Sequence, residues 1–193
     1  MELTSKKALE MIEEGRKENP NINWVAHSIC VGNTAAKIAE NLGLDVEYTK
    51  TLGYIHDIGK LEGDFKDHDI TGYHYMKKLG YSDKYANICL THSYLNNDVN
   101  CTAGGVPEED SFRTEFIKNH EYTIYEKIIN LCDLMCKRKV LTIDKRLIDL
   151  IIRRGAHENT QYHVKETYKL KQYFDEKLGF DVYDLFPSIK DNL

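Results

Sequence analysis

The stretch His56-Asp57-Ile58-Gly59-Lys60 places an imidazole beside a carboxylate, at a position where a helix is predicted to end. Neighbouring side chains on a helix point in different directions, so one ion binds both only if the helix ends there or a second ion lies alongside. Gly59 permits such an ending, because glycine readily adopts the left-handed backbone that closes many helices. Two adjacent residues could also be a coincidence in a chain with 8 histidines. The surrounding residues therefore decide what the pair means.

The composition of the 193-residue chain favours a single domain with a helical tail. A net charge of -5 argues against a nucleic-acid partner, although Lys137-Arg138-Lys139 leaves a local basic patch. The amino terminus lacks the apolar core of a signal peptide, and no run of about 18 apolar residues could span a bilayer. We therefore expect a cytoplasmic protein with no membrane partner. The pattern does not predict an oligomeric state.

The 5 cysteines lack the paired close spacing of a disulfide framework, which favours a reducing compartment. Cys132 and Cys136 lie four residues apart, on one face of a predicted helix. We interpret them as small buried apolar side chains.

Apolar residues recur mostly at steps of three and four, and only 3 prolines interrupt the chain. This is the helical period, so the sequence predicts an all-α fold. One helix is predicted from Asn23 to Leu42, with His27 on its first turn and Gly43 as its stop. Asp45 is predicted to cap a second helix that ends at the His56-Asp57 pair.

Further helices are predicted along the rest of the chain. They run from about Asp67 to Leu79, from a cap at Ser82 to His92, from Tyr122 to Cys136, from Asp144 to Arg154 and from Glu158 to Leu178, with residues 180–186 packing as a tail. Residues 93–114 show no clear period and are interpreted as a long loop, a kind of segment that often carries function. Asp133 follows Ile129 by four residues, which predicts a carboxylate on the apolar face, where a metal or a cation would offset its burial.

Taken in order, His27, the His56-Asp57 pair and Asp133 resemble the ligand pattern of the HD superfamily of metal-dependent phosphohydrolases. The resemblance covers about residues 23–138 and rests on two linked segments, Val25 to Ser28 at a helix start and Gly53 to Lys60 at a helix end. It implies an all-α HD-domain helical bundle with one ion held by ligands from separate helices. The expected organisation is a single HD-type domain over 1–193, with a metal-binding core over about 23–138 and a helical extension over about 141–193.

The segments Lys66 to Gly72 and Cys89 to His92 look like those that supply two additional histidines in binuclear members. The resemblance then implies a first ion and a second ion that share one carboxylate. The first would be bound by His27, His56, Asp57 and Asp133, and the second by Asp57, His68 and His92. Such ligands, without thiolate, suit one or two divalent transition metal ions, with Fe or Mn favoured and Co, Ni or Zn compatible.

The remaining histidines are weighed against this set. His74 competes with His68, but six residues separate them and the family pattern favours His68. His92 could instead be a hydrogen-bonded core histidine. The others match no ligand segment and are assigned to surface or packing roles: His120, His157 and His163.

Lys60 follows the pair by three residues, close enough to reach an open metal position. A positive charge there would neutralise a phosphate oxygen in the transition state, as the equivalent lysine does in hydrolytic relatives; otherwise it is a solvated charge. Asp64 and Lys66 are weak candidates for contacts with substrate or with a metal-bound water. Arg153-Arg154 is left out of the site, because paired arginines at a helix end usually complement its dipole.

The resemblance implies a metal-dependent phosphohydrolase in which metal-activated hydroxide attacks a nucleotide or another small phosphorylated metabolite. Asp57 and Lys60 are the predicted catalytic residues. Two alternatives stay open: an HD-fold diiron oxygenase, which shares ligands of the His68 and His92 type, and a non-catalytic regulatory module that binds metal or nucleotide. Lys60 argues against the oxygenase, and the intact ligand set argues against the module. Cyclic dinucleotides are disfavoured, because Ser93-Tyr94-Leu95-Asn96 replaces the Gly-Tyr-Pro element of that subgroup.

Overall fold

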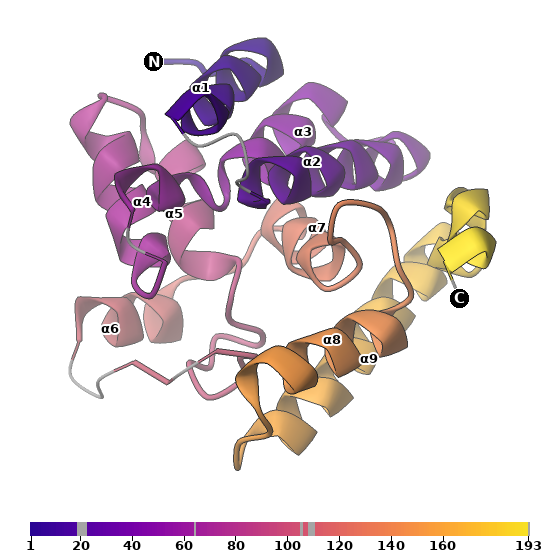
Figure 1. The fold of residues 1–193 in the computed structure, drawn as a ribbon. Helices are drawn as coiled ribbons and strands as arrows, with labels where there is room; N and C mark the ends of the chain where they lie inside the picture. The colour runs from indigo at the N-terminus through magenta and orange to yellow at the C-terminus, as the bar shows by residue number, and fades with distance from the viewer. Residues whose placement is uncertain (19–22, 64, 105, 108–110, 193) are drawn as a thin grey trace.

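The computed structural model describes residues 1–18, 23–63, 65–104, 106–107 and 111–192, and within these the chain folds into helices without a sheet (Figure 1). The elements are, in chain order, α1 (Ser5–Glu18), α2 (Trp24–Asn41), α3 (Val46–Ile55), η1 (Ile58–Glu62), α4 (His68–Lys78), α5 (Asp83–Thr91), α6 (Phe112–Asn119), α7 (Ile124–Asp133), α8 (Ile143–Arg154), α9 (Thr160–Leu178), η2 (Val182–Leu185) and η3 (Pro187–Asn192). The predicted all-α fold is confirmed. In the described part of the chain, no helix combines the length and the apolar character needed to cross a membrane.

Local sequence signals set several helix ends where they were predicted. Gly43, after α2, has a left-handed φ of +66°, and Gly80, after α4, has a φ of +82°. The side chain of Asp45 caps α3 by accepting a backbone N–H at 2.9 Å. These three ends depend on neighbouring residues, which is why the sequence alone located them. Helix α7, predicted from Tyr122, instead begins after Thr123, which caps it and forms a capping box with Glu126.

Two helices were not anticipated. The predictions left α1 unassigned, although its apolar residues Ala8, Met11 and Ile12 are buried in the core. The predicted loop over 93–114 was too long, because α6 begins at Phe112. In α6 only Ile117 is buried, so no apolar stripe marked this short helix.

The end of α7 also differs from the prediction. The helix ends at Asp133, three residues before Cys136, and Asp133 is its last residue. Its side chain is 23% exposed and does not belong to the apolar core that was expected around it. The early end of the helix turns the carboxylate toward a cleft. Cys132 and Cys136 are buried free thiols, as interpreted from the sequence.

Helices α2 and α3 pack against each other with almost no space between their backbones. A Cβ on Gly53 would lie only 2.5 Å from the Cα of Gly32. Only glycines allow this approach, which brings the first turn of α2 beside the last turn of α3. The two segments that carry the resemblance therefore meet in space.

A second close approach joins η1 to the start of α4. A Cβ on Gly59 would lie 1.9 Å from the carbonyl oxygen of His68 and 2.5 Å from the backbone nitrogen of Gly72. Gly59 is not among the glycines with a positive φ, so the predicted role in closing the helix is wrong. Its lack of a side chain instead lets His68 approach the His56-Asp57 turn.

The carboxyl-terminal helices belong to the same packing. Helices α8 and α9 lie side by side (Figure 1), and α9 also contacts α7. Leu147, Leu150 and Phe174 share one apolar cluster with the residues of α2 and α3. The predicted tail packs as well, because Val182 and Phe186 are buried in that cluster.

We expect Gly59→Ala to destabilise the protein, because the added methyl group would overlap backbone atoms that cannot move independently. The expected loss is roughly 1–3 kcal/mol, the usual range for overpacking. Denaturant unfolding would measure it. The matched control is Gly104→Ala, where a Cβ meets its nearest atom at an ordinary 3.5 Å. Equal stability of the two variants would contradict the packing role of Gly59.

His163 predicts a pH dependence of stability. It lies in α9, its residue is 4% exposed, and burial lowers its pKa from 6.5 to about 4. Below pH 6.5 the unfolded chain therefore takes up a proton that the folded chain binds only near pH 4, so the free energy of unfolding falls across this window. The loss is on the order of 3 kcal/mol at most. His163→Gln should show a shallower fall between these pH values in denaturant unfolding, and identical slopes would contradict the argument.

Candidate metal centre

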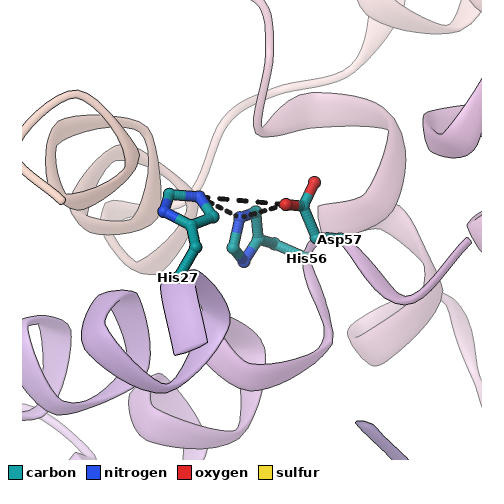
Figure 2. A group of neighbouring side chains, drawn as sticks. All are labelled: His27, His56 and Asp57. Atoms are coloured by element: carbon teal, nitrogen blue, oxygen red, sulfur yellow. Dashed lines mark hydrogen bonds and ion pairs between the residues drawn. The ribbon is translucent and has the colours of Figure 1, made fainter. Parts of the chain in front are cut away.

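The His56-Asp57 pair lies where α3 ends, as the sequence predicted. His56 keeps a helical backbone (φ -54°, ψ -35°), whereas Asp57 leaves it (φ -101°, ψ 12°). This change lets the two adjacent side chains turn toward the same point. Figure 2 shows His27, from the first turn of α2, pointing toward the pair.

Each carboxylate oxygen of Asp57 faces two histidines. Oδ2 lies 3.8 Å from Nε2 of His27 and 3.6 Å from Nε2 of His56 (Figure 2). Oδ1 lies 3.1 Å from Nε2 of His68 and 3.6 Å from Nε2 of His92. His68 begins α4 and His92 follows the last turn of α5. The structure thus forms two groups of candidate ligand atoms that share Asp57.

Asp133 completes the first group from the end of α7. Its Oδ1 lies 2.8 Å from Nε2 of His27, and a guanidinium nitrogen of Arg146 lies 3.9 Å away. Removal from water raises the pKa of Asp133, but the contact with His27 and the charge of Arg146 hold it well below its usual range. The carboxylate is therefore ionised at neutral pH. All six residues predicted as ligands lie around one centre, and their role as ligands stays a prediction.

Backbone carbonyls orient all the imidazoles in the same sense. Each Nδ1 atom of the four histidines lies 2.8 to 3.3 Å from a carbonyl oxygen. The carbonyls belong to Lys137 for His27, Gly53 for His56, Phe65 for His68 and Cys89 for His92. A carbonyl oxygen only accepts, so each contact favours the tautomer with its proton on Nδ1, in which the lone pair of Nε2 points into the centre.

The lone pairs then face each other. The Nε2 atoms of His27 and His56 are 3.3 Å apart, and those of His68 and His92 are 3.2 Å apart. Burial lowers the pKa of His56 to about 3 and also lowers the pKa of His92, so both rings are neutral at pH 7. Converging lone pairs repel one another unless a cation lies among them. Hydrogen-bonded imidazoles in this orientation are the usual arrangement of metal-binding histidines.

Asp57 supplies the central negative charge. It is 2% exposed, and burial alone would raise the pKa of its carboxyl, but Lys60 and His56 hold the pKa well below its usual range. The Nζ of Lys60 lies 2.5 Å from Oδ2. Neutral imidazoles and ionised carboxylates without a thiolate fit a divalent transition metal.

The other candidate residues lie elsewhere or beside this centre. His74 is exposed and stacks on Phe112, so the structure brings His68 and not His74 to Asp57. His92 is buried, and its Nε2 points at Asp57. It therefore does more than fill space in the core. His120 lies away from the centre, and its Nε2 is 2.8 Å from a carboxylate oxygen of Glu126, which is consistent with a packing role. Asp64 lies outside the described residues, and Lys66 lines the cleft.

The centre lies in a cleft of about 1200 Å³. Eight lysine and arginine residues line it against four aspartates, although the chain as a whole carries a net charge of -5. The cations are Lys60, Lys66, Arg113, Lys137, Arg138, Arg146, Arg153 and Arg154. Sequence reasoning missed the arginines of α8 as cleft residues. The spacing of Arg146 and Arg153 by seven, which places them on one face of a helix, was the available signal.

Comparisons with known proteins agree with this geometry. The family model described as HD domain matches residues 24–137. A ribonuclease Y of Pseudothermotoga lettingae is 40% identical over 76 residues, covering 36% of this chain and 14% of the relative. A ribonuclease Y of Fervidobacterium nodosum is 37% identical over 95 residues (46% and 18%), and one of Lactobacillus acidophilus is 41% identical over 95 residues (49% and 15%).

The similarity to these relatives is partial. The chain spans less than a fifth of the length of the ribonucleases that it matches. No solved structure gave a significant match to the chain. The family model, however, covers more than half of the chain and includes all six residues of the centre. As its residues suggested, the chain belongs to the HD domain family.

Proposed function

We propose that the protein is a metal-dependent phosphohydrolase that acts on a nucleotide or another small phosphorylated metabolite. One observation carries the proposal: the Nε2 atoms of four imidazoles and both oxygens of Asp57 converge at a cleft in which cations outnumber carboxylates. Converging donors suit metal ions, and an excess of cations suits a phosphorylated ligand. Membership of the HD domain family supports hydrolytic chemistry.

The donor set would hold two ions. His27, His56, Asp57 and Asp133 would bind the first, and Asp57, His68 and His92 the second. The division of the contacts between the two oxygens of Asp57 supports a shared carboxylate. Bound divalent ions would lower the pKa of a coordinated water and polarise phosphate oxygens.

Lys60 would bind an oxygen of the transferred phosphoryl group. It lines the cleft, its side chain is 17% exposed, and its ammonium contacts Asp57. Charge compensation of Asp57 by metal would free this ammonium to turn toward the phosphate. A point charge on a flexible stem suits that exchange of partners.

A ribonuclease activity is the second candidate, because the relatives described in the preceding subsection carry the name ribonuclease Y. One observation favours a small substrate instead. A cleft of about 1200 Å³ suits a ligand of nucleotide size. The oxygenase and the binding module rank lower, because Lys60 and the complete donor set remain in place.

Metal content should separate the two proposed sites. Asp57→Ala should lose both ions, because Asp57 belongs to both groups, whereas His68→Ala should lose only the second. Elemental analysis of the purified, dialysed proteins, after loading with Mn or Fe, would measure the stoichiometry. His74→Ala is the matched histidine control and should keep both ions. Equal losses in the Asp57 and His68 variants would argue against separate sites.

Phosphate release should identify the reaction. A panel of nucleotides, small phosphoesters and an RNA oligomer, incubated anaerobically with Mn or Fe, should yield phosphate from small substrates with the intact protein and none with Asp57→Ala. Lys60→Ala should keep its metal and lose activity by about 10²-fold, the usual cost of one transition-state contact.

The same incubations rank the alternatives. Shortening of the RNA oligomer on a gel, without phosphate release from the small substrates, would favour a ribonuclease, because cleavage of a phosphodiester leaves the phosphate on an RNA fragment. Oxygen uptake by the iron-loaded protein in air, without phosphate release anaerobically, would favour the oxygenase. Bound metal with neither reaction would leave the binding module. An unchanged rate in Lys60→Ala would remove that lysine from the mechanism.

A further inference from the structure

A second group of cations lines the same cleft from the carboxyl-terminal side of Asp133. It consists of Lys137 and Arg138, in the turn after α7, and Arg146, Arg153 and Arg154 on α8. None of these belongs to the two groups of candidate metal ligands. The reaction proposed at the centre uses Lys60 and none of these five cations.

One carboxylate holds three of these cations in place. Asp149 lies 2.8 Å from Nζ of Lys137, 3.2 Å from Nη1 of Arg146, and 3.0 and 2.8 Å from Nε and Nη2 of Arg153. Partial desolvation raises the pKa of Asp149, but Arg153 and Lys137 lower it to about 2, so it stays ionised. A single negative charge shared by three positive ones leaves the group cationic.

Arg154 and Arg138 add further positive charge. Both are exposed and line the cleft, and within the described ranges neither forms an ion pair with a carboxylate. The guanidinium of Arg154 lies toward the loop at Gly104, where a Cβ would meet its Nη1 at 3.5 Å. The residue is exposed as a whole, but the walls of the cleft partly desolvate its guanidinium, which lowers the pKa; the charge of Asp133 opposes this effect, and the charges of Arg153 and Arg146 add to it. A guanidinium with no carboxylate partner beside other cations suits an anionic ligand.

The position of this group relates it to the metal centre. Arg146 contacts both Asp149 and Asp133, so one side chain joins the cation group to a candidate ligand. Arg154 is attracted by the charges of Asp133 and Asp57. Anions bound at the centre and at Arg154 would therefore occupy one continuous cleft.

We propose that Arg154, with Arg138 and the Asp149-held Arg153, forms a second anion subsite that binds a distal phosphate of the substrate. The substrate class is a small molecule with a chain of phosphates, such as a nucleoside polyphosphate. This inference rests on the proposed function, in which one phosphate of the same substrate reacts at the metal centre.

One feature favours a phosphate chain over RNA, because guanidinium groups bind the phosphates of both. Sequence-independent binding of single-stranded RNA also uses aromatic side chains as stacking platforms. Between residues 133 and 157, no Phe, Tyr or Trp is among the described residues that line the cleft. This wall therefore recognises charge and not bases.

Binding without turnover tests the subsite directly. The probe is the bis-methylene analogue of tripolyphosphate, which cannot be hydrolysed, with methylphosphonate as the single-anion comparison. Calorimetry on the as-purified full chain, dialysed to remove free metal, should show tighter binding of the analogue than of methylphosphonate. Arg154→Gln should weaken the analogue by about tenfold or more and leave methylphosphonate unchanged. Arg138→Gln should weaken the analogue in the same direction.

The matched control is Arg16→Gln. Arg16 also lies in the last turn of a helix, α1, and pairs with Glu13, but it does not line the cleft. It should leave binding of the analogue unchanged. Equal affinity of wild type and Arg154→Gln, or the same loss in Arg16→Gln, would overturn the proposal. Tighter binding of an RNA oligomer, with its affinity lost in Arg154→Gln, would overturn it in favour of an RNA groove.

Kinetics distinguish failure of the subsite from failure of the proposed function. Arg154→Gln should raise the KM of a nucleoside triphosphate about tenfold and leave that of a monophosphate unchanged. Unchanged constants for both substrates, with turnover intact, would reject the subsite alone. Absence of phosphate release from any substrate, with Arg154-dependent binding of the analogue retained, would reject the proposed reaction and keep the anion site.

Discussion

The buried carboxylate of Asp57 is the interaction on which the rest of the centre depends. An ionised carboxylate removed from water costs several kcal/mol unless charges and polar groups compensate it. Here Lys60 and the imidazoles from α2, α3, α4 and α5 surround it. Four helices must therefore meet at one point, and close backbone approaches at Gly32, Gly53 and Gly59 allow them to do so.

The backbone around the centre also prepares its chemistry. Carbonyl oxygens from four separate segments accept the Nδ1 protons and leave the Nε2 lone pairs facing inward. The turn after α7 takes part twice, because it supplies the carbonyl of Lys137 and follows the carboxylate of Asp133. A change in this turn would thus affect the orientation of His27 and the position of Arg138 together. The metal centre and the second group of cations therefore depend on the same turn.

Charge in this protein is distributed unevenly, and the net charge of the chain does not show this. The net charge of -5 argued against a nucleic-acid partner, yet the cleft carries more cations than carboxylates. Asp149 holds three of them on one side chain, so a single acidic residue organises a basic wall. Local charge and not the net charge decides which ligands this cleft attracts.

The sequence by itself determined the helical fold and most helix boundaries, and its resemblance to the HD superfamily implied the six residues of the centre, whose role as ligands stays a prediction. The helix boundaries depend on short-range signals: Asp45 caps α3 through neighbouring backbone, and the His56-Asp57 pair needs only a helix end. Only the tertiary structure decided that Gly59 is needed for close approach, that α6 exists, and that Arg154 lines the cleft. Each of these depends on contacts between residues far apart in the chain. The spacing of residues within one segment therefore could not predict them, because it does not specify which other segment packs against it.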